Sequence, residues 1–198
     1  DEIHADLVYP GERHTALATL AGDADNLVTA VAPSKTFNIP GLGLSALIVS
    51  NPEHRARLRR AFDLLHVGGS NPFSIAAFAA AYRHGGPWLD ALLAYLAQTR
   101  DEVIAFLDLY LPAIKPIRPE GTYLSWLDCR ALCRKLGLDD AALRQFFIRE
   151  ARVGMNPGTV FGAGGGGFMR LNIGAPRAVV LEALDRIVDA LARRNSTI

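Results

Sequence analysis

Four short apolar runs of strand type alternate along the chain with longer segments of helical periodicity. The runs are residues 26–33 (NLVTAVAP), 44–50 (LSALIVS), 121–128 (GTYLSWLD) and 168–174 (FMRLNIG). An alternation of this kind predicts an α/β fold. The first two runs are largely apolar and are bounded by Asp, Pro and Gly, which indicates buried strands of a parallel sheet.

Helix start signals support the intervening helical segments. Asn-Pro pairs at 51–52 and 71–72 place an N-cap candidate before a proline at the first helical position. From Pro87 to about Tyr110 the apolar residues keep helical spacing, which predicts a helix longer than the typical ~10 to 14 residues and able to bridge two lobes. The remaining helical segments are residues 139–152, capped by Asp139 or Asp140, and 176–194.

Composition and charge exclude several classes of protein. The chain has 198 residues, of which 50% are hydrophobic and 21% charged, as in an ordinary globular protein with a core. A formal net charge of +1 gives no concentrated basic surface for nucleic acid or an acidic membrane. The densest basic cluster, residues 53–60 (EHRARLRR), has the spacing of a solvated helix face.

The same sequence indicates a cytoplasmic protein. No apolar run reaches the ~18 residues of a membrane span, and the first seven residues carry three acids, unlike a signal peptide. Cys129 and Cys133 have no nearby histidine to complete a zinc set, so we expect reduced thiols and no metal site.

Glycines and aromatic residues supply two further expectations. The run at 162–167 (GAGGGG) lacks the Gly-Lys-Ser/Thr of a phosphate-binding loop, so it is expected to be a surface connection or a flexible loop near a substrate entrance. The aromatic residues that fall on apolar faces, and are therefore expected in the core, are Trp88, Trp126, Phe146 and Phe147.

Lys35 is one of three lysines in a chain that otherwise takes its positive charge from arginine. It follows the first strand-like run. A lysine becomes a nucleophile that forms Schiff bases when burial or nearby cations disfavour its charged form, and an apolar pocket at a strand end supplies that environment. The alternative is a lysine exposed in a surface loop.

Four motifs extend these observations to a family. They are DEIHADL (1–7), SKTFNIPGLGL (34–44), PEGTYLSWLDCR (119–130) and FMRLNIGAPR (168–177). In this order and spacing they resemble the pyridoxal-phosphate (PLP)-dependent C–S lyases of the cystathionine β-lyase (MalY/PatB) group, within the class I/II aminotransferase superfamily of fold type I. The resemblance covers essentially the whole chain and corresponds to the C-terminal half of the family.

The resemblance implies a domain organisation and a partner. Residues 1–86 would be the C-terminal part of a large PLP-binding domain with a mixed or parallel sheet. Residues 87–198 would be a smaller α+β C-terminal domain that includes the bridging helix. A first half would precede them in a longer protein, and family members are homodimers, so a homodimer is implied as well.

The resemblance also implies a cofactor site. Lys35 would hold PLP as a Schiff base, release it to the substrate amine and then move the Cα proton, while Asp1 would bind the pyridine nitrogen and keep it protonated. Ser34 would contact the phosphate. His4 stands where many aminotransferases carry a tyrosine that contacts the phenolic oxygen, and a purely structural histidine is the alternative. The phosphate-binding arginine that many aminotransferases have shortly after the lysine is absent, which fits the lyase group better.

The implied substrate is an amino acid. Arg170 matches the superfamily arginine that binds the α-carboxylate through two parallel, charge-assisted hydrogen bonds. Tyr123 also lies in a family motif, where it contacts substrate or only packs. The implied reaction is α,β-elimination from sulfur-containing L-amino acids. The alternatives are a class I/II aminotransferase and an inactive fragment or binding module that lacks the first half.

Overall fold

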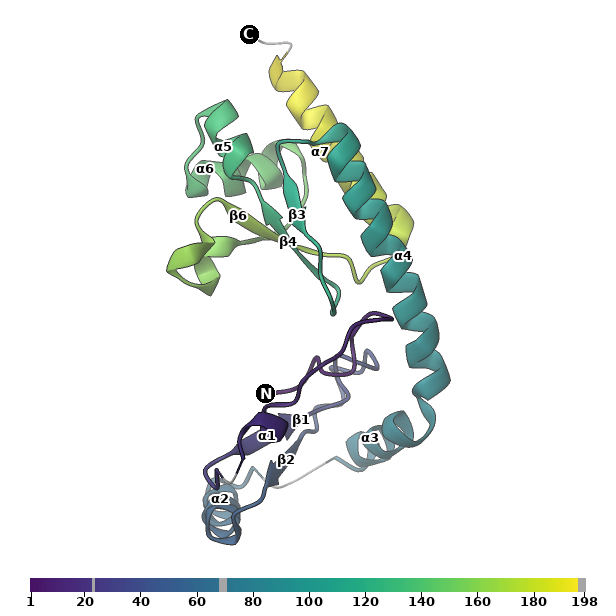
Figure 1. Ribbon diagram of the computed structural model, residues 1–198, viewed down its shortest axis with the longest axis vertical. Helices are drawn as coiled ribbons and strands as arrows, with labels where there is room; N and C mark the ends of the chain where they lie inside the picture. The colour runs from purple at the N-terminus through teal and green to yellow at the C-terminus, as the bar shows by residue number, and fades with distance from the viewer. Residues whose placement is uncertain (23, 68–70, 196–198) are drawn as a thin grey trace. The chain divides into compact units, whose positions relative to one another are not determined.

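The computed structural model describes residues 1–22, 24–67 and 71–195, which form two compact units, Asp1–Leu93 and Ala94–Ile198 (Figure 1). The boundary falls inside the long helix α4 (Gly86–Tyr110), which contributes residues to both units. The predicted boundary between residues 86 and 87 lies at the start of this helix.

The first unit is built around a two-stranded antiparallel sheet. Strand β1 (Val28–Val31) pairs with β2 (Ala46–Val49), with Val28 opposite Val49. Both strands were predicted, but the expectation that they are buried strands running parallel is wrong for this pair. Val28 is 44% exposed and Ile48 57% exposed. The connection between the strands contains no helix, and antiparallel pairing does not require a crossover helix whereas parallel pairing does.

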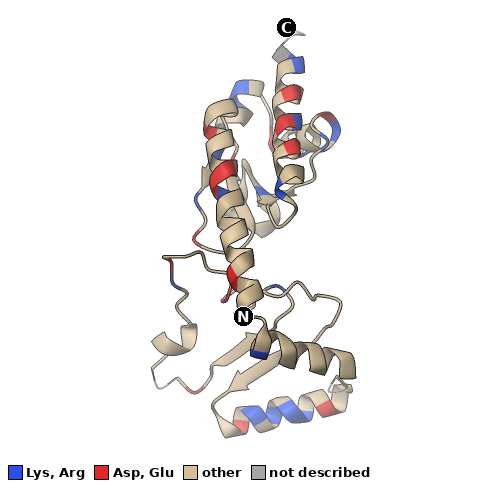
Figure 2. Ribbon diagram, turned by 90° about the vertical axis from the view of Figure 1, so that its right-hand side faces the viewer, with Lys and Arg blue, Asp and Glu red and all other residues tan. Residues whose placement is uncertain are grey.

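The capped helices of this unit form as predicted. In α2 (Pro52–Leu65) the side chain of Asn51 accepts two backbone N–H bonds at 2.8 and 3.1 Å. In α3 (Pro72–His84) the side chain of Asn71 accepts one at 2.8 Å. These bonds satisfy amides that the first helical turn leaves without partners. The basic residues of α2 lie along its exposed surface, as predicted for a solvated face (Figure 2). The four-residue helix α1 (Leu17–Leu20) was not predicted.

The second unit contains a four-stranded antiparallel sheet in the order β3-β4-β6-β5. Its strands are β3 (Lys115–Ile117), β4 (Leu124–Asp128), β5 (Asn156–Pro157) and β6 (Phe168–Asn172). The two longer strands, β4 and β6, were predicted and form the centre of the sheet. The edge strands were not predicted, because each has at most three residues and includes a proline.

The helices of this unit complete the predicted alternation. They are α5 (Arg130–Leu136), α6 (Asp140–Gln145), which continues as a π-helix (Phe146–Glu150), and α7 (Arg177–Asn195). Asp139, one of the two predicted caps, accepts the backbone N–H of Ala142 at 2.8 Å. The α/β class is therefore confirmed. Within the described ranges no helix combines the length and the apolarity needed to cross a membrane.

The two faces of the central strands have different surroundings. Ser125 and Leu127 of β4, with Met169 and Leu171 of β6, are buried and face the core. The core also takes residues from α4 and α7, which lie side by side (Figure 1). Alternate residues of the same strands therefore lie on the opposite face, because side chains alternate along a strand. These are Trp126, Asp128, Phe168 and Arg170.

The predicted aromatic core is only partly correct. Phe146 and Phe147 are 1% and 0% exposed, which confirms them as core residues. Trp88 is 45% exposed, so its assignment to the core is wrong. It lies in the first turn of α4, where the centre of its ring is 6.0 Å from that of Phe37. Trp126 is partly buried on the face opposite the core.

Hydrogen bonds from Arg177 connect the start of α7 to α4. Its backbone N–H donates to the Tyr95 hydroxyl at 2.6 Å, and its guanidinium lies 4.8 Å from the centre of that ring. The same guanidinium donates to Glu102 at 2.7 Å and to Gln98 at 2.9 Å. The loop that follows β6 is therefore fixed at its far end by charge-assisted hydrogen bonds.

Candidate active site

Lys35 lies in a short helical turn directly after β1. The backbone N–H of Phe37 donates to the Pro33 carbonyl at 2.9 Å, and that of Ile39 donates to the Ser34 carbonyl at 3.0 Å. Asn38 adopts a left-handed conformation with φ 52°, which Asn tolerates better than most residues. The chain therefore leaves the strand through a hydrogen-bonded turn, which gives Lys35 a defined position at the strand end.

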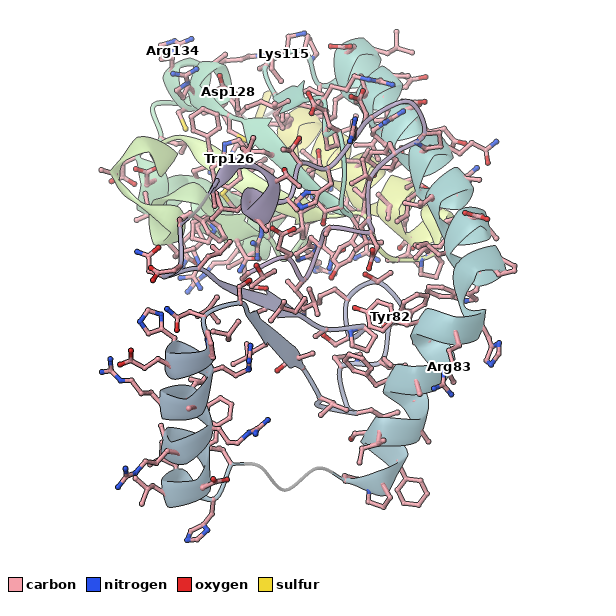
Figure 3. The ribbon with its side chains drawn as sticks, turned by 60° about the horizontal axis from the view of Figure 1, so that its bottom comes forward. Tyr82, Arg83, Lys115, Trp126, Asp128 and Arg134 are labelled. Atoms are coloured by element: carbon pink, nitrogen blue, oxygen red, sulfur yellow. The ribbon has the colours of Figure 1, made fainter. Side chains whose placement is uncertain are left out.

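The neighbours of Lys35 anchor this turn. Thr36 is fully buried, and its hydroxyl donates to the Asp6 carboxylate at 3.3 Å. The Phe37 ring contacts the Tyr82 ring edge-on, with 5.8 Å between the ring centres. Tyr82 belongs to α3 and lies near the C-terminal end of that helix (Figure 3). Burial raises the pKa of Tyr82, and the negative charge of Asp6 raises it further.

The Lys35 side chain itself is exposed. It has no hydrogen bond or ion pair with any residue in the described part of the chain. The predicted strand-end position is therefore present, but these residues do not surround Lys35 with the apolar pocket that was expected. A primary amine with no carboxylate bound to it remains available to a carbonyl compound.

The N-terminal segment runs beside the strand that leads to Lys35. The backbone N–H of Glu2 donates to the Ala30 carbonyl of β1 at 2.8 Å. This bond places the segment that carries Asp1 and His4 beside β1, the strand that precedes Lys35. The Asp1 carboxylate is exposed and accepts the backbone N–H of Ile3 at 3.1 Å, whereas His4 is partly buried.

Ser34 lines a cavity of about 840 Å³ together with Ile3 of the N-terminal segment. Arg55 and Arg59 of α2 also line it, with Asp63 as the acidic residue of the lining. The two arginines give the wall a net positive charge beside the Ser34 hydroxyl. From the sequence these two arginines were predicted only to lie on a solvated helix face. Their spacing of four residues places them on the same side of α2, but the irregular chain between β1 and β2 gave no signal that it would approach them.

In the second unit, Arg170 lies on the face of β6 opposite the core. Its guanidinium donates to the Asn156 side-chain oxygen at 3.2 Å, and its central carbon lies 4.4 Å from the centre of the Phe161 ring. Its Nε is buried and has no hydrogen-bond partner among the residues that the structure describes. A buried donor without a partner is costly unless a ligand satisfies it. Sequence analysis missed both Asn156 and Phe161.

Tyr123 lies close enough to Arg170 for their charges to interact. Burial raises the pKa of Tyr123, and the positive charge of Arg170 partly offsets this rise. The Tyr123 carbonyl accepts the backbone N–H of Ile173 at 2.8 Å, which extends the pairing of β4 and β6 beyond the strands. Its ring packs so closely on Gly174 that a Cβ there would lie 3.0 Å from it. The two predicted substrate residues are therefore brought together.

The glycine run is more than a surface connection, which corrects the expectation for residues 162–167. Gly165 is buried, and a Cβ added there would lie 2.0 Å from the Gly158 carbonyl oxygen. The two glycines thus allow two backbone segments to touch, the 3₁₀ turns Gly158–Phe161 and Ala163–Gly165. This contact closes the chain into the compact loop that carries Phe161.

The predicted site residues therefore form two groups. Asp1, His4, Ser34 and Lys35 belong to the first unit, around the end of β1. Tyr123 and Arg170 belong to the second unit: Arg170 lies on the face of β6 opposite the core, and Tyr123, just before β4, is partly buried and packs against the core. Their roles toward a cofactor or a substrate remain predictions.

Comparison with known proteins gives a consistent family. The family model for aminotransferase class I and II matches residues 1–187. Cystathionine beta-lyase PatB of Bacillus subtilis is 45% identical over 193 residues, which are 97% of this chain and 49% of that protein. Protein MalY of Escherichia coli is 33% identical over 192 residues, which are 96% of this chain and 48% of that protein.

Solved structures agree. Cystalysin from Treponema denticola, which contains a pyridoxal 5'-phosphate cofactor, aligns with a TM-score of 0.88 and 37% identity, over 98% of this chain and 48% of that one. The PLP-bound C–S lyase from Staphylococcus hominis aligns with a TM-score of 0.87 and 34% identity, over 96% of this chain and 49% of that one. The chain spans about half the length of the curated relatives it matches. The resemblance seen in the four sequence motifs is confirmed: the chain belongs to the aminotransferase class I and II family.

Proposed function

We propose that the protein containing this chain is a PLP-dependent C–S β-lyase that acts on sulfur-containing L-amino acids. The names of relatives such as cystathionine beta-lyase PatB support the reaction, and the PLP-bound structural neighbours support the cofactor. The observation on this chain that carries the proposal is Arg170. Its guanidinium is oriented by a ring and an amide oxygen, and its buried Nε still lacks a partner.

Arg170 has the chemistry to bind an α-carboxylate. A carboxylate accepts two parallel hydrogen bonds from one guanidinium edge, and Nε contributes to such an edge. Binding there would supply the hydrogen bond that the buried Nε lacks. Tyr123, beside Arg170, would then border the amino acid.

The first unit has residues that fit PLP. Lys35 offers an exposed amine without an ion pair to the described residues, and Ser34 offers a hydroxyl on a cavity wall with two arginines for the phosphate. We assign Asp1 to the pyridine nitrogen and His4 to the phenolic oxygen. When bound, PLP accepts electrons from the Cα of the substrate and so makes its proton acidic.

The remaining steps depend on proton transfers by Lys35. Its amine would accept the proton from Cα, after which the C–S bond at Cβ would break and the sulfur would leave with the bonding electrons. Proton return to the thiolate gives the thiol, and hydrolysis of the released aminoacrylate gives pyruvate and ammonia. The cytoplasmic location and the homodimer remain predictions.

A class I/II aminotransferase is the second candidate. It is favoured by the family itself and by the PLP-bound putative aminotransferase from Clostridium difficile, which aligns with a TM-score of 0.91 and 37% identity. In that reaction no group leaves from Cβ, and the amino group is transferred to a keto acid. An inactive fragment or binding module is the third candidate.

The test is the visible absorption spectrum of the PLP-loaded protein before and after addition of cystathionine, with pyruvate measured in parallel. We expect a cofactor band that disappears in Lys35→Ala and persists in Lys115→Ala, a matched exposed lysine of β3. Full turnover in Lys35→Ala would refute the assignment. Keto-acid-dependent amino transfer without pyruvate release would favour the aminotransferase, and absence of any band from residues 1–198 alone would favour the module for that chain.

A further inference from the structure

A second recess lies in the second unit, where the π-helix ends beside one face of α7. Its volume is about 620 Å³. Four arginines line it, together with two carboxylates and two alanines, and the residues are Arg149, Glu150, Ala151, Arg152, Arg186, Asp189, Ala190 and Arg193. The lining therefore carries two more positive than negative charges. None of the residues assigned to PLP or to the amino acid belongs to it.

Three of these arginines donate hydrogen bonds to neutral oxygen atoms. Arg193 donates to the Glu150 main-chain carbonyl at 3.0 Å, and Arg186 to the Arg152 main-chain carbonyl at 3.5 Å. Arg149 donates through Nε to the Gln145 side-chain oxygen at 2.8 Å. These hydrogen bonds order the three guanidiniums before an anion arrives, which lowers the cost of binding one.

The acidic residues of the recess do not balance this charge. The Glu150 carboxylate accepts two hydrogen bonds from Arg194, at 2.6 and 2.5 Å, and these hold the pKa of Glu150 below its usual value. Glu182 lies outside the lining and pairs with Arg186, so it offsets the charge of that one arginine. Asp189 is exposed and has no ion pair with the described residues, so it is the carboxylate that opposes an incoming anion.

Arg152 is the most available of the four cations. It has a left-handed backbone with φ 55°, which is uncommon for a residue other than glycine. Its guanidinium is exposed and has no hydrogen bond or ion pair within the part of the chain that is described. Arg152 therefore adds to the lining of the recess a cation that no described residue pairs.

We propose that this recess binds a small multivalent anion that carries phosphate groups. The planar fork of a guanidinium matches phosphate oxygens, and several guanidiniums around one recess favour two or more phosphates over one. The volume falls within the ~300 to 1,000 Å³ of small-molecule sites. This proposal does not depend on the proposed PLP chemistry.

The test is isothermal titration calorimetry of the chain with inorganic pyrophosphate at constant ionic strength. We expect Arg152→Gln and Arg193→Gln each to weaken binding about three- to tenfold, and the pair of changes to weaken it further. Arg134→Gln is the matched control, because Arg134 is an exposed arginine on α5 that projects away from the body of the unit (Figure 3). It should bind pyrophosphate like the unchanged chain.

Asp189→Asn gives a test in the opposite direction. Removing the opposing carboxylate should tighten pyrophosphate binding, a gain that misfolding cannot produce. Equal losses in Arg134→Gln and Arg152→Gln, unchanged binding in the double variant, or no gain in Asp189→Asn would overturn the site. Tighter binding of citrate than of pyrophosphate would overturn the assignment to phosphate. Loss of PLP binding in Lys35→Ala with intact pyrophosphate binding would separate this site from the proposed active site.

Discussion

The guanidinium of Arg170 lies 4.4 Å from the centre of the Phe161 ring, although Phe161 belongs to a 3₁₀ turn and Arg170 to a strand. Trp126, opposite Arg170 in the sheet, meets Phe161 edge-on at 5.5 Å. The ring therefore restrains the plane of the guanidinium while the Asn156 oxygen restrains one end of it. A cation held in this way loses little conformational freedom when it binds a planar carboxylate.

Arg170→Lys should weaken amino-acid binding in the active protein. A lysine keeps the charge but loses the fork and the stacking, so we expect KM to rise about ten- to hundredfold, the equivalent of roughly 1.5 to 3 kcal/mol, with a smaller change in kcat. Steady-state kinetics with cystathionine measures this. Arg130→Lys is the matched control, because Arg130 also lies over a ring, that of Phe168, but is paired with Asp128. An unchanged KM in Arg170→Lys would show that the carboxylate is bound elsewhere.

Gly165→Ala should destabilise the second unit. The added methyl group would overlap the Gly158 backbone, and relief requires two main-chain segments to separate, so we expect a loss of about 1 to 3 kcal/mol in the free energy of unfolding. Urea denaturation measures it. Gly164→Ala is the control within the same run, since a Cβ there meets no atom within 4 Å. Equal stability of the two variants would disprove the close-contact explanation.

The ion pair of Glu150 and Arg194 should make the free energy of unfolding depend on pH. Hydrogen bonds from Arg194 lower the pKa of Glu150 in the folded state. The contribution of this carboxylate to the free energy of unfolding is therefore fully present above its unfolded pKa, near 4.5, and is lost as the pH falls through its lower folded pKa. Because both side chains are about one-third exposed, we expect Glu150→Gln to cost only about 0.5 to 1 kcal/mol at pH 7.

Urea denaturation of Glu150→Gln and of the unchanged chain at pH 7 and pH 3.5 measures this pair. The difference between them should shrink at the lower pH. Glu120→Gln, at an exposed glutamate, should show no such trend. A difference that stays constant with pH would rule out the ion pair as its source.

The two cysteines should differ in reactivity. Burial raises the pKa of both thiols, but Cys129 is 0% exposed whereas Cys133 is partly exposed. Since the thiolate is the reactive form, a thiol reagent should modify one group in the native chain and both in urea. Cys133→Ser should abolish the native reaction. Rapid modification of both thiols in the unchanged chain would contradict the buried position of Cys129.

Local sequence signals predicted the features that local physics determines. The caps Asn51 and Asn71 were found because a side chain that accepts an amide two or three residues ahead needs no tertiary information. Strand β5 has two residues, and its pairing with β6 depends on the folded loop between them, so no periodicity could reveal it. Trp88 was wrongly predicted to be in the core, because helical spacing identifies an apolar face of a helix but does not show which element packs against that face.

In the candidate site, too, local motifs predicted some residues, whereas others depend on tertiary contacts. Lys35 and Arg170 were chosen from motifs, since each carries its chemistry in one side chain. The residues that hold Arg170 were missed. Asn156 is 14 residues away, and Phe161 reaches it through a loop that closes only because Gly158 and Gly165 touch. Such partners are set by tertiary contacts that a linear pattern does not record.

Strand β6 has a further consequence for how this site can form. Met169 and Leu171 point into the core and Arg170 points away from it, so a slip of one residue along β4 would bury the guanidinium and expose both apolar side chains. Such a slip is too costly to persist. The burial of Met169 and Leu171 therefore determines the orientation of Arg170. Any chain that has folded with these two side chains in the core has Arg170 on the opposite face of the sheet.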